Sequence, residues 1–233
     1  MAELWRYPVK SLRGEPVDAA ELGPQGLHGD RQWAVFDSDT GLGLTGRRVP
    51  ELLFAAARVR EDDTVEITLP DGRVIADDEA LSSWLGRPVE LRKASDHRPR
   101  QYENAGDTET EAPDSWYAFT GSDAGFHDKL AVTLLSPESA GSAALARFRA
   151  NVILDRGGED RLVGTKVRVG EALVTVVEPV PRCVMVTRPQ PGGIELDRDV
   201  LRRIHRERDG VLAVGGTVER AGVVRIGDEV GPA

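Results

Sequence analysis

The chain has 233 residues, and its 30 lysines and arginines stand against 39 aspartates and glutamates, for a formal net charge of -9 at pH 7. This acidic excess argues against general binding to nucleic acid or to an anionic membrane surface. A single cysteine excludes an intrachain disulfide, an iron–sulfur cluster held by about four thiolates, and a multi-cysteine zinc site. No apolar stretch has the length of a signal peptide or a membrane span, which predicts a cytoplasmic location.

Most of the chain has the apolar periodicity of β-strands. Valine-rich runs separated by Gly, Asp and Pro predict a mainly β fold of β-barrels or sandwiches, with a few short helices. In chain order, strands are predicted at residues 31–37, 52–60, 64–69, 88–92, 131–135, 151–154, 172–177, 184–187 and 211–219. Helices are predicted from a cap at Asp77 to Leu85, from Ser136 with Pro137 in the first turn, and from a cap at Asp197 to Gly210.

Residues 41–46 match the dinucleotide-binding pattern G-x-G-x-x-G. That pattern requires a strand that runs directly into a helix, whereas here Pro50 follows closely and interrupts a helix at its first turn. The match is therefore interpreted as accidental.

Periodicity is lost between Lys93 and Trp116, where charged residues and prolines accumulate. Such a stretch is typical of a linker or a long functional loop. The domain boundary is predicted there, and it divides the chain into residues 1–95 and residues 96–233.

Cys183 follows Pro181 and Arg182, between two stretches that are predicted as buried strands. A lone thiol is a core residue, a nucleophile or a metal ligand. The Arg182 guanidinium favours the thiolate, which is the form that attacks electrophiles and binds soft metals. Residue type alone leaves the three roles open, because free cysteine is also among the most buried residue types.

Four other segments each place a cation or a hydroxyl at the edge of a predicted strand. They are Tyr7-Pro8-Val9-Lys10-Ser11, Gly29-Asp30-Arg31-Gln32-Trp33, Leu44-Thr45-Gly46-Arg47 and Arg147-Phe148-Arg149-Ala150-Asn151. Taken singly, each is interpreted as structural. With Arg182-Cys183 and the ending Gly222–Asp228, their order and spacing resemble the MOSC family of molybdenum-cofactor-binding domains with its N-terminal β-barrel partner domain. The resemblance covers nearly the whole chain and points to the amidoxime-reducing component type.

The resemblance implies a molybdopterin-type molybdenum cofactor, with Cys183 as the metal ligand and catalytic residue. It also implies that cations and neighbouring polar groups hold the pterin and its phosphate. The cofactor-binding residues expected on this basis are Lys10, Ser11, Arg31, Thr45, Arg47, Arg149, Asn151, Arg182 and Cys183. Because a pterin dithiolene brings two sulfurs, one protein thiolate suffices. Pyridoxal phosphate is not required.

The chain departs from the family pattern at Asp128-Lys129-Leu130-Ala131. Members often carry an Asp-Thr-Ser-Pro-like segment at this place, so the hydroxyl contacts expected there are missing.

The resemblance further implies an oxidoreductase that removes oxygen from small N-hydroxylated compounds such as hydroxylamines or amidoximes. Because no cysteine follows Cys183, the electrons are expected from a separate redox protein with a heme, flavin or iron–sulfur centre. The alternative is a carrier of molybdenum cofactor or of sulfur, with a persulfide on Cys183 and no turnover of its own. A third interpretation is a β-rich binding module without the cofactor.

Overall fold

The computed structural model describes residues 1–95, 101–105, 116–121 and 125–233. The chain forms two compact units, each assembled from segments that are far apart in the sequence. The large-sheet unit contains Met1–Arg6, Pro16–His28 and Leu130–Ala233, and the small-sheet unit contains Tyr7–Glu15 and Gly29–Lys129. The predicted boundary between residues 95 and 96 stays a prediction.

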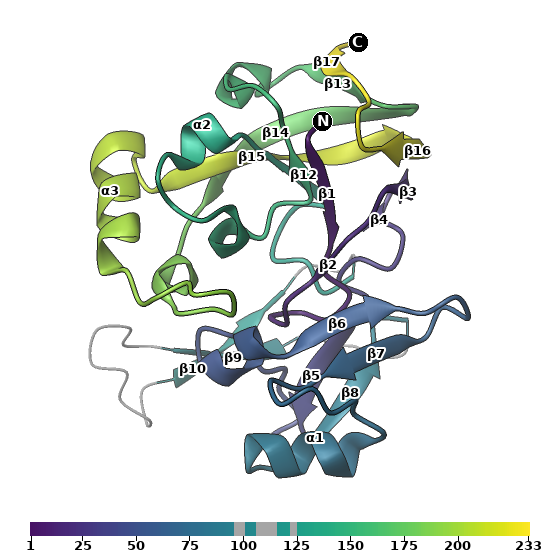
Figure 1. Cartoon of the computed structure of the whole chain (residues 1–233), viewed down its shortest axis with the longest axis vertical. Coiled ribbons are helices and arrows are strands. Elements are labelled where there is room, and N and C mark those ends of the chain that lie inside the picture. The colour runs from purple at the N-terminus through teal and green to yellow at the C-terminus, as the bar shows by residue number, and fades with distance from the viewer. Residues whose placement is uncertain (96–100, 106–115, 122–124) are drawn as a thin grey trace. The chain divides into compact units, whose positions relative to one another are not determined.

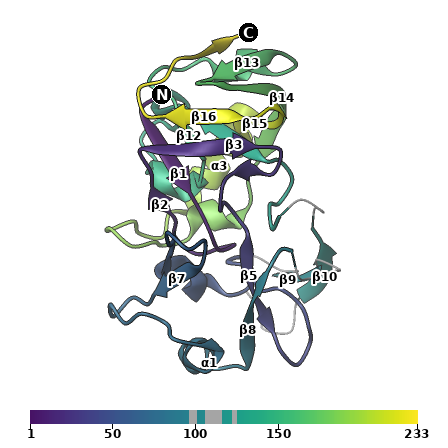
Figure 2. The same cartoon turned by 90° about the vertical axis from the view of Figure 1, so that its right-hand side faces the viewer.

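The large-sheet unit is built on an 8-stranded sheet in the order β17-β13-β14-β15-β11-β12-β1-β2 (Figure 1). Its strands are β1 (Glu3–Arg6), β2 (Glu15–Pro16), β11 (Val132–Leu135), β12 (Val152–Ile153), β13 (Lys166–Val169), β14 (Ala172–Pro181), β15 (Val211–Arg220) and β17 (Val230–Pro232). A smaller sheet contains β16 (Gly222–Arg225), β3 (Ala19–Gly23) and β4 (Gly26–Leu27), and Figure 2 shows β16 beside β3.

The core of this unit follows from the alternation of strand side chains between two faces. Val167 and Val169 of β13 share a face, as do Val174 and Val176 of β14, and all four are buried in one apolar cluster. Leu22 of β3 enters the same cluster, so both sheets contribute to it. The alternation of apolar residues that predicts these strands therefore also places their valines in the core.

The helices of the large-sheet unit lie between β11 and β15 along the chain. They are α2 (Pro137–Ala140), η2 (Leu145–Phe148), η3 (Glu159–Leu162), η4 (Val184–Thr187) and α3 (Arg198–Arg208), where η denotes a 3-10 helix. Ser136 caps α2 and Asp197 caps α3 through their side chains, as predicted. Val200 and Ile204 of α3 pack in a second apolar cluster that also contains Val186 of η4.

The predicted strand at residues 184–187 is wrong, because this segment forms the helix η4. The Arg147 guanidinium donates to the carbonyl oxygens of Val186 and Arg188 at 3.1 and 3.0 Å. The Thr187 hydroxyl donates to the Val184 carbonyl at 2.8 Å. These contacts use acceptors that a strand would offer to its neighbour, so tertiary structure overrides the β-propensity of the valines.

The small-sheet unit consists of antiparallel strand pairs (Figure 1). They are β5 (Trp33–Asp37) with β8 (Val89–Lys93), β6 (Ala56–Val59) with β7 (Val65–Thr68), and β9 (Gln101–Ala105) with β10 (Trp116–Thr120). The helix α1 (Asp78–Leu85) begins after the Asp77 cap and ends at Gly86, as predicted. Together with the large sheet, these pairs confirm the mainly β fold with a few short helices.

Two further predictions in this unit need correction. The predicted strand 52–60 is divided into η1 (Pro50–Phe54) and β6, because Pro50 favours a first helical turn. The predicted linker contains β9, which pairs with β10 and whose residue Tyr102 is buried beside Phe36. Residues 96–100 and 106–115 of that linker lie outside the described residues.

A buried ionic network in the small-sheet unit predicts a loss of stability in acid. Arg87 pairs with Asp37 at 2.6 Å and with Glu103 at 2.8 Å. Burial disfavours the charged form of Asp37, but hydrogen bonds from Thr40 and Arg87 outweigh burial and lower the pKa of this carboxyl. Because the folded state has the lower pKa, the stabilisation is present above the unfolded pKa and is lost as pH falls through the folded pKa.

We therefore expect Asp37→Asn to reduce the dependence of the unfolding free energy on pH below about pH 5. Urea denaturation over a pH series measures this dependence. Asp39→Asn is the matched control, since Asp39 is exposed and close in sequence. Equal acid dependence in the two variants would contradict the assignment.

Candidate functional site

Cys183 lies directly after β14, where the chain leaves the large sheet. Pro181 still pairs with Val211 of β15, and the Arg182 N–H donates to the Gly210 carbonyl at 2.9 Å. Cys183 has an extended backbone and forms the N-cap of η4. It is a free, half-buried cysteine. The fold thus presents the thiol at a fixed strand end and not in the interior of either apolar cluster.

The Arg182 side chain connects this strand end to the turn after η2. Its Nε donates to the Leu212 carbonyl at 2.8 Å, and its Nη1 donates to the Phe148 carbonyl at 2.9 Å. The guanidinium also lies over the Phe148 ring, 5.6 Å from its centroid. Three contacts therefore hold the cation that precedes the thiol.

Arg149 occupies the turn that Arg182 holds. It is the C-cap of η2 and has a left-handed backbone with φ 53. A non-glycine residue keeps this conformation only where its surroundings enforce it. The hydrogen bond from Arg182 to the Phe148 carbonyl is one such constraint, and it brings the Arg149 turn to the Arg182-Cys183 strand end.

Arg147 is a functional candidate that the sequence did not single out. It is 6% exposed, and its guanidinium donates to Val186, Arg188 and Glu195 carbonyls at 3.1, 3.0 and 2.6 Å. Burial lowers the pKa of the Arg147 guanidinium and outweighs the negative charge of Asp197, which by itself would raise that pKa. Arg147 therefore organises the segment that Cys183 begins. The Arg-Phe-Arg spacing was the available signal, but it could not show which arginine faces inward.

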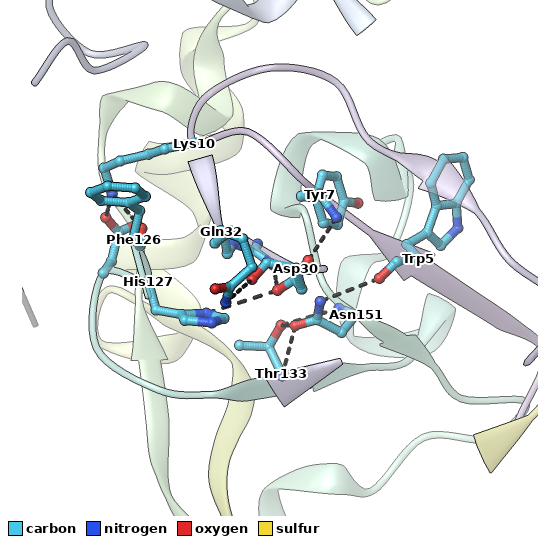
Figure 3. Close-up of polar contacts among 11 residues, drawn as sticks. Trp5, Tyr7, Lys10, Asp30, Gln32, Phe126, His127, Thr133 and Asn151 are labelled. Carbon is cyan, nitrogen blue, oxygen red and sulfur yellow. Dashed lines mark hydrogen bonds and ion pairs between the residues drawn. The ribbon is translucent and has the colours of Figure 1, made fainter. Parts of the chain in front are cut away.

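Asn151 is 1% exposed, and its side-chain amide is bonded within the large-sheet unit (Figure 3). Its Oδ1 accepts the Thr133 N–H and the Thr133 hydroxyl, both at 3.2 Å. Its Nδ2 donates to the Trp5 carbonyl at 3.2 Å. The amide thus ties together the segments of β11, β12 and β1, and its predicted contact to a cofactor stays a prediction.

Lys10 lies in the small-sheet unit with its ammonium group fixed on several sides (Figure 3). Nζ donates to the Phe126 carbonyl at 3.3 Å and forms a short ion pair with Asp128. It also lies 4.8 Å from the centroid of the Tyr102 ring. The Lys10 ammonium is therefore preorganised before any ligand binds.

Arg31 forms a second ionic group in the same unit. It pairs with the fully buried Asp30 at 2.5 Å and lies over the Tyr7 ring at 4.7 Å. Asp30 also accepts the Tyr7 N–H at 2.6 Å, and His127 Nδ1 lies 3.8 Å from its carboxylate (Figure 3). Neither Asp30 nor His127 is among the predicted site residues, although Asp30 is the direct neighbour of Arg31 in sequence; the four histidines of the chain are scattered.

Ser11 and the Thr45–Arg47 turn meet in the small-sheet unit. The Ser11 Oγ accepts the Gly46 N–H at 2.8 Å, and the Thr45 hydroxyl donates to the Glu103 carbonyl at 2.9 Å. The Thr45 backbone carbonyl accepts the N–H groups of Arg48 and Val49 at 2.9 and 2.7 Å, which closes the turn that carries the half-buried Arg47. Ser11 and Thr45 are therefore brought together with Arg47 through one loop.

The predicted site residues thus fall into two groups, one in each unit. Lys10, Ser11, Arg31, Thr45 and Arg47 belong to the small-sheet unit. Arg149, Asn151, Arg182 and Cys183 belong to the large-sheet unit. Their roles toward a cofactor remain predictions.

The donor set around Cys183 can be compared with the needs of a metal. Within the described ranges, no group of three or more His, Cys, Asp or Glu side chains is placed to hold a metal ion. Cys183 offers one thiol, Arg182 precedes it in sequence, and the Arg182 guanidinium is bonded to the turn that carries Arg149. This set fits a metal that arrives with most of its ligands from a bound cofactor.

In the described part of the chain, no helix is long and apolar enough to span a bilayer.

Two family models match the chain. The MOSC N-terminal beta barrel domain matches residues 1–116, and the MOSC domain matches residues 127–231. Both Lys10 and the Thr45–Arg47 turn lie within the first match, and Cys183 and Arg149 lie within the second. Sequence resemblance and family models therefore agree.

The chain is similar to two kinds of protein. The chain is 24% identical over 257 residues to a molybdenum cofactor sulfurase of Drosophila mojavensis, in a match that covers 94% of this chain and 32% of that protein. It is 40% identical over 74 residues to mitochondrial amidoxime reducing component 2 of Bos taurus, which covers 30% of this chain and 21% of that protein. The chain thus corresponds to about a third of the sulfurase, and its match to the second relative is local. The YUAD protein of Bacillus subtilis, a solved structure, is 12% identical with a TM-score of 0.42 over 98% of this chain and 91% of that chain.

Proposed function

The chain belongs to the family that joins a MOSC N-terminal beta barrel domain to a MOSC domain, and from this membership we propose that it is a molybdenum-cofactor enzyme that reduces N-hydroxylated compounds. The observation that carries the proposal is the half-buried Cys183 thiol at the end of β14, beside an arginine that is tied to the Arg149 turn. When bound, the cofactor supplies a metal that changes oxidation state as the substrate loses oxygen.

Cys183 would provide the single protein sulfur ligand. Arg182 keeps a fixed positive charge next in sequence to the thiol, because its guanidinium is bound to two carbonyl oxygens. The thiolate is the form of a cysteine that binds a metal. Arg182 is thus a positioning residue for Cys183, and Arg149 adds a second cation in the same unit.

The hydroxyl groups of the small-sheet unit differ in what they can still offer to a phosphate. Ser11 accepts a hydrogen bond from Gly46, which leaves the hydrogen of its own hydroxyl for a phosphate oxygen. Thr45 already donates its hydroxyl hydrogen to Glu103. We therefore propose Ser11 as a donor to the cofactor phosphate, with Arg47, Lys10 and Arg31 as the positive charges of that unit.

The reaction also needs a source of two electrons. Cys183 is the only cysteine of the chain, so its own residues do not provide the thiolates of an iron–sulfur centre. We propose a separate redox protein with a heme, flavin or iron–sulfur group as the donor.

The test combines composition with turnover. The chain is purified from a host that makes the cofactor, and molybdenum and oxidised pterin are measured beside the reduction of an N-hydroxylated amidine by a reduced viologen dye. We expect about one equivalent of each component and reduction that depends on the dye. Folded protein without metal and pterin would overturn the proposal, and so would loaded protein without turnover.

A sulfur carrier is the second candidate. The observation in its favour is that the match to a molybdenum cofactor sulfurase spans 94% of this chain, whereas the match to the amidoxime reducing component spans 30%. A carrier would hold a persulfide on Cys183. Cyanide would then release thiocyanate from the parent chain and not from Cys183→Ser, and loaded protein would not reduce the N-hydroxylated substrate.

A further inference from the structure

The ion pair of Lys10 with Asp128 joins two side chains of opposite accessibility. The Lys10 side chain is 9% exposed, whereas the Asp128 side chain is 88% exposed. Water therefore reaches the carboxylate but hardly reaches the lysine side chain. The ammonium group therefore has a buried side and one outward direction, and the carboxylate occupies that direction.

The buried side of the ammonium group is rigid. The Phe126 carbonyl accepts a hydrogen bond from Nζ, and the Tyr102 ring lies below it at 4.8 Å. Tyr102 is itself held between two glycines, since a Cβ added at Gly43 or at Gly121 would lie 2.5 Å from its ring. Lys10 is thus a preorganised cation that keeps its place when its outward partner changes.

Asp128 acts on a second cation as well. Burial alone would lower the pKa of Arg31, but the charges of Asp30, Tyr7 and Asp128 raise it above its ordinary value. Arg31 and Lys10 belong to the same unit, and both are influenced by this one exposed carboxylate. An anion at the Asp128 carboxylate would therefore be attracted by both side chains.

We propose that the Asp128 carboxylate occupies the place of a phosphate oxygen at Lys10 in the ligand-free chain, and that an incoming phosphate group displaces it. The ligand class is a phosphate monoester or inorganic phosphate. The identification of this phosphate with that of the cofactor rests on the proposed function, whereas the displacement itself does not.

The energetics favour exchange. An ion pair with an exposed partner contributes about 0–1 kcal/mol, because water solvates the freed carboxylate. A phosphate carries up to about two negative charges and several acceptor oxygens, so it interacts more strongly with a fixed ammonium and a nearby guanidinium. In the ligand-free chain, Asp128 neutralises the Lys10 ammonium group and thereby lowers the affinity of this position for an anion.

The test measures binding of inorganic phosphate to the cofactor-free full chain by isothermal titration calorimetry. We expect Asp128→Asn to bind phosphate about fivefold more tightly than the parent, the factor that corresponds to about 1 kcal/mol. Asp199→Asn is the control with the same change of charge, because Asp199 is 84% exposed and paired with Arg202 on α3. Equal affinity in the parent and in Asp128→Asn would overturn the proposal, as would an equal gain in Asp199→Asn.

The location of the phosphate is tested by a second variant. Asp128→Asn combined with Lys10→Met should lose the gain in affinity. Amide chemical shifts provide an independent readout if that variant does not fold, because phosphate should shift Phe126 and Tyr102 in the Asp128→Asn chain. Shifts confined to other parts of the chain would contradict the assignment to Lys10.

Repeating the titration on the cofactor-loaded chain distinguishes the phosphate of the cofactor from free inorganic phosphate. If the cofactor phosphate takes the place, loaded Asp128→Asn should no longer bind inorganic phosphate. If loaded and cofactor-free chains bind it equally, the place serves free phosphate and the link to the cofactor fails. If the chain never loads a cofactor, the proposed function fails while the calorimetric result for Asp128 still stands.

Discussion

Cys183→Ser is expected to lose molybdenum, and with it at least about a hundredfold of the reduction rate, while the chain remains folded. Serine keeps the shape of the side chain but replaces the soft sulfur ligand with a hydroxyl, which stays neutral near neutral pH. The half-buried position at the N-cap of η4 predicts a small effect on stability. Metal analysis, pterin fluorescence and turnover with a reduced dye measure the change.

Val184→Ala is the matched control for this substitution. Val184 is the next residue, is also half-buried, and has no side-chain atom that binds a metal. It should retain molybdenum and turnover. Full metal content and turnover in Cys183→Ser would remove the cysteine from the metal site, and loss of both in Val184→Ala would show that the segment and not the thiolate is responsible.

Arg147→Met is expected to lower the free energy of unfolding by about 2–4 kcal/mol, because it leaves the buried carbonyl oxygens of Val186 and Arg188 and the partly buried one of Glu195 without this donor. The three acceptors are on Val186, Arg188 and Glu195, and all of them belong to the segment that follows Cys183. Arg147→Lys should recover part of this loss, since an ammonium group reaches fewer of the three than the guanidinium fork does. Urea denaturation measures both variants.

Arg202→Met is the control for the loss of an arginine. Arg202 is exposed on α3, and its substitution should change stability by less than about 0.5 kcal/mol. Arg147→Lys, which should fold, also allows a test beyond stability, namely the rate at which iodoacetamide alkylates Cys183. A changed rate in Arg147→Lys with an unchanged rate in Arg202→Met is expected. Equal stability of Arg147→Met and Arg202→Met would contradict the role assigned to the fork.

The fold was predictable where a local signal was sufficient. Asp77 and Gly86 frame α1, and Asp197 caps α3, because a side-chain acceptor and a left-handed glycine satisfy helix ends locally. The strand at 184–187 was mispredicted for the opposite reason. Its valines favour a strand, but the acceptors of its backbone are used by Arg147, which lies far away in the sequence.

The candidate site shows the same division. Cys183 and Arg182 were identifiable because one cysteine beside an arginine is a visible pattern, and the family models agree with the resemblance that included them. The hydrogen bonds of the buried Arg147 guanidinium and the ion pair of Lys10 with Asp128 could not be predicted from the sequence. Both depend on contacts across many residues of sequence that no local spacing reveals.

The sequence by itself determined the mainly β class, the absence of an intrachain disulfide, the single thiol and the family. These follow from composition, strand period and short motifs, which are properties of neighbouring residues. Only the tertiary structure decided which arginine organises the Cys183 segment and which exposed carboxylate neutralises Lys10. The physical reason is that hydrogen bonds and ion pairs depend on distances in space, and folding sets these distances between segments that the sequence keeps apart.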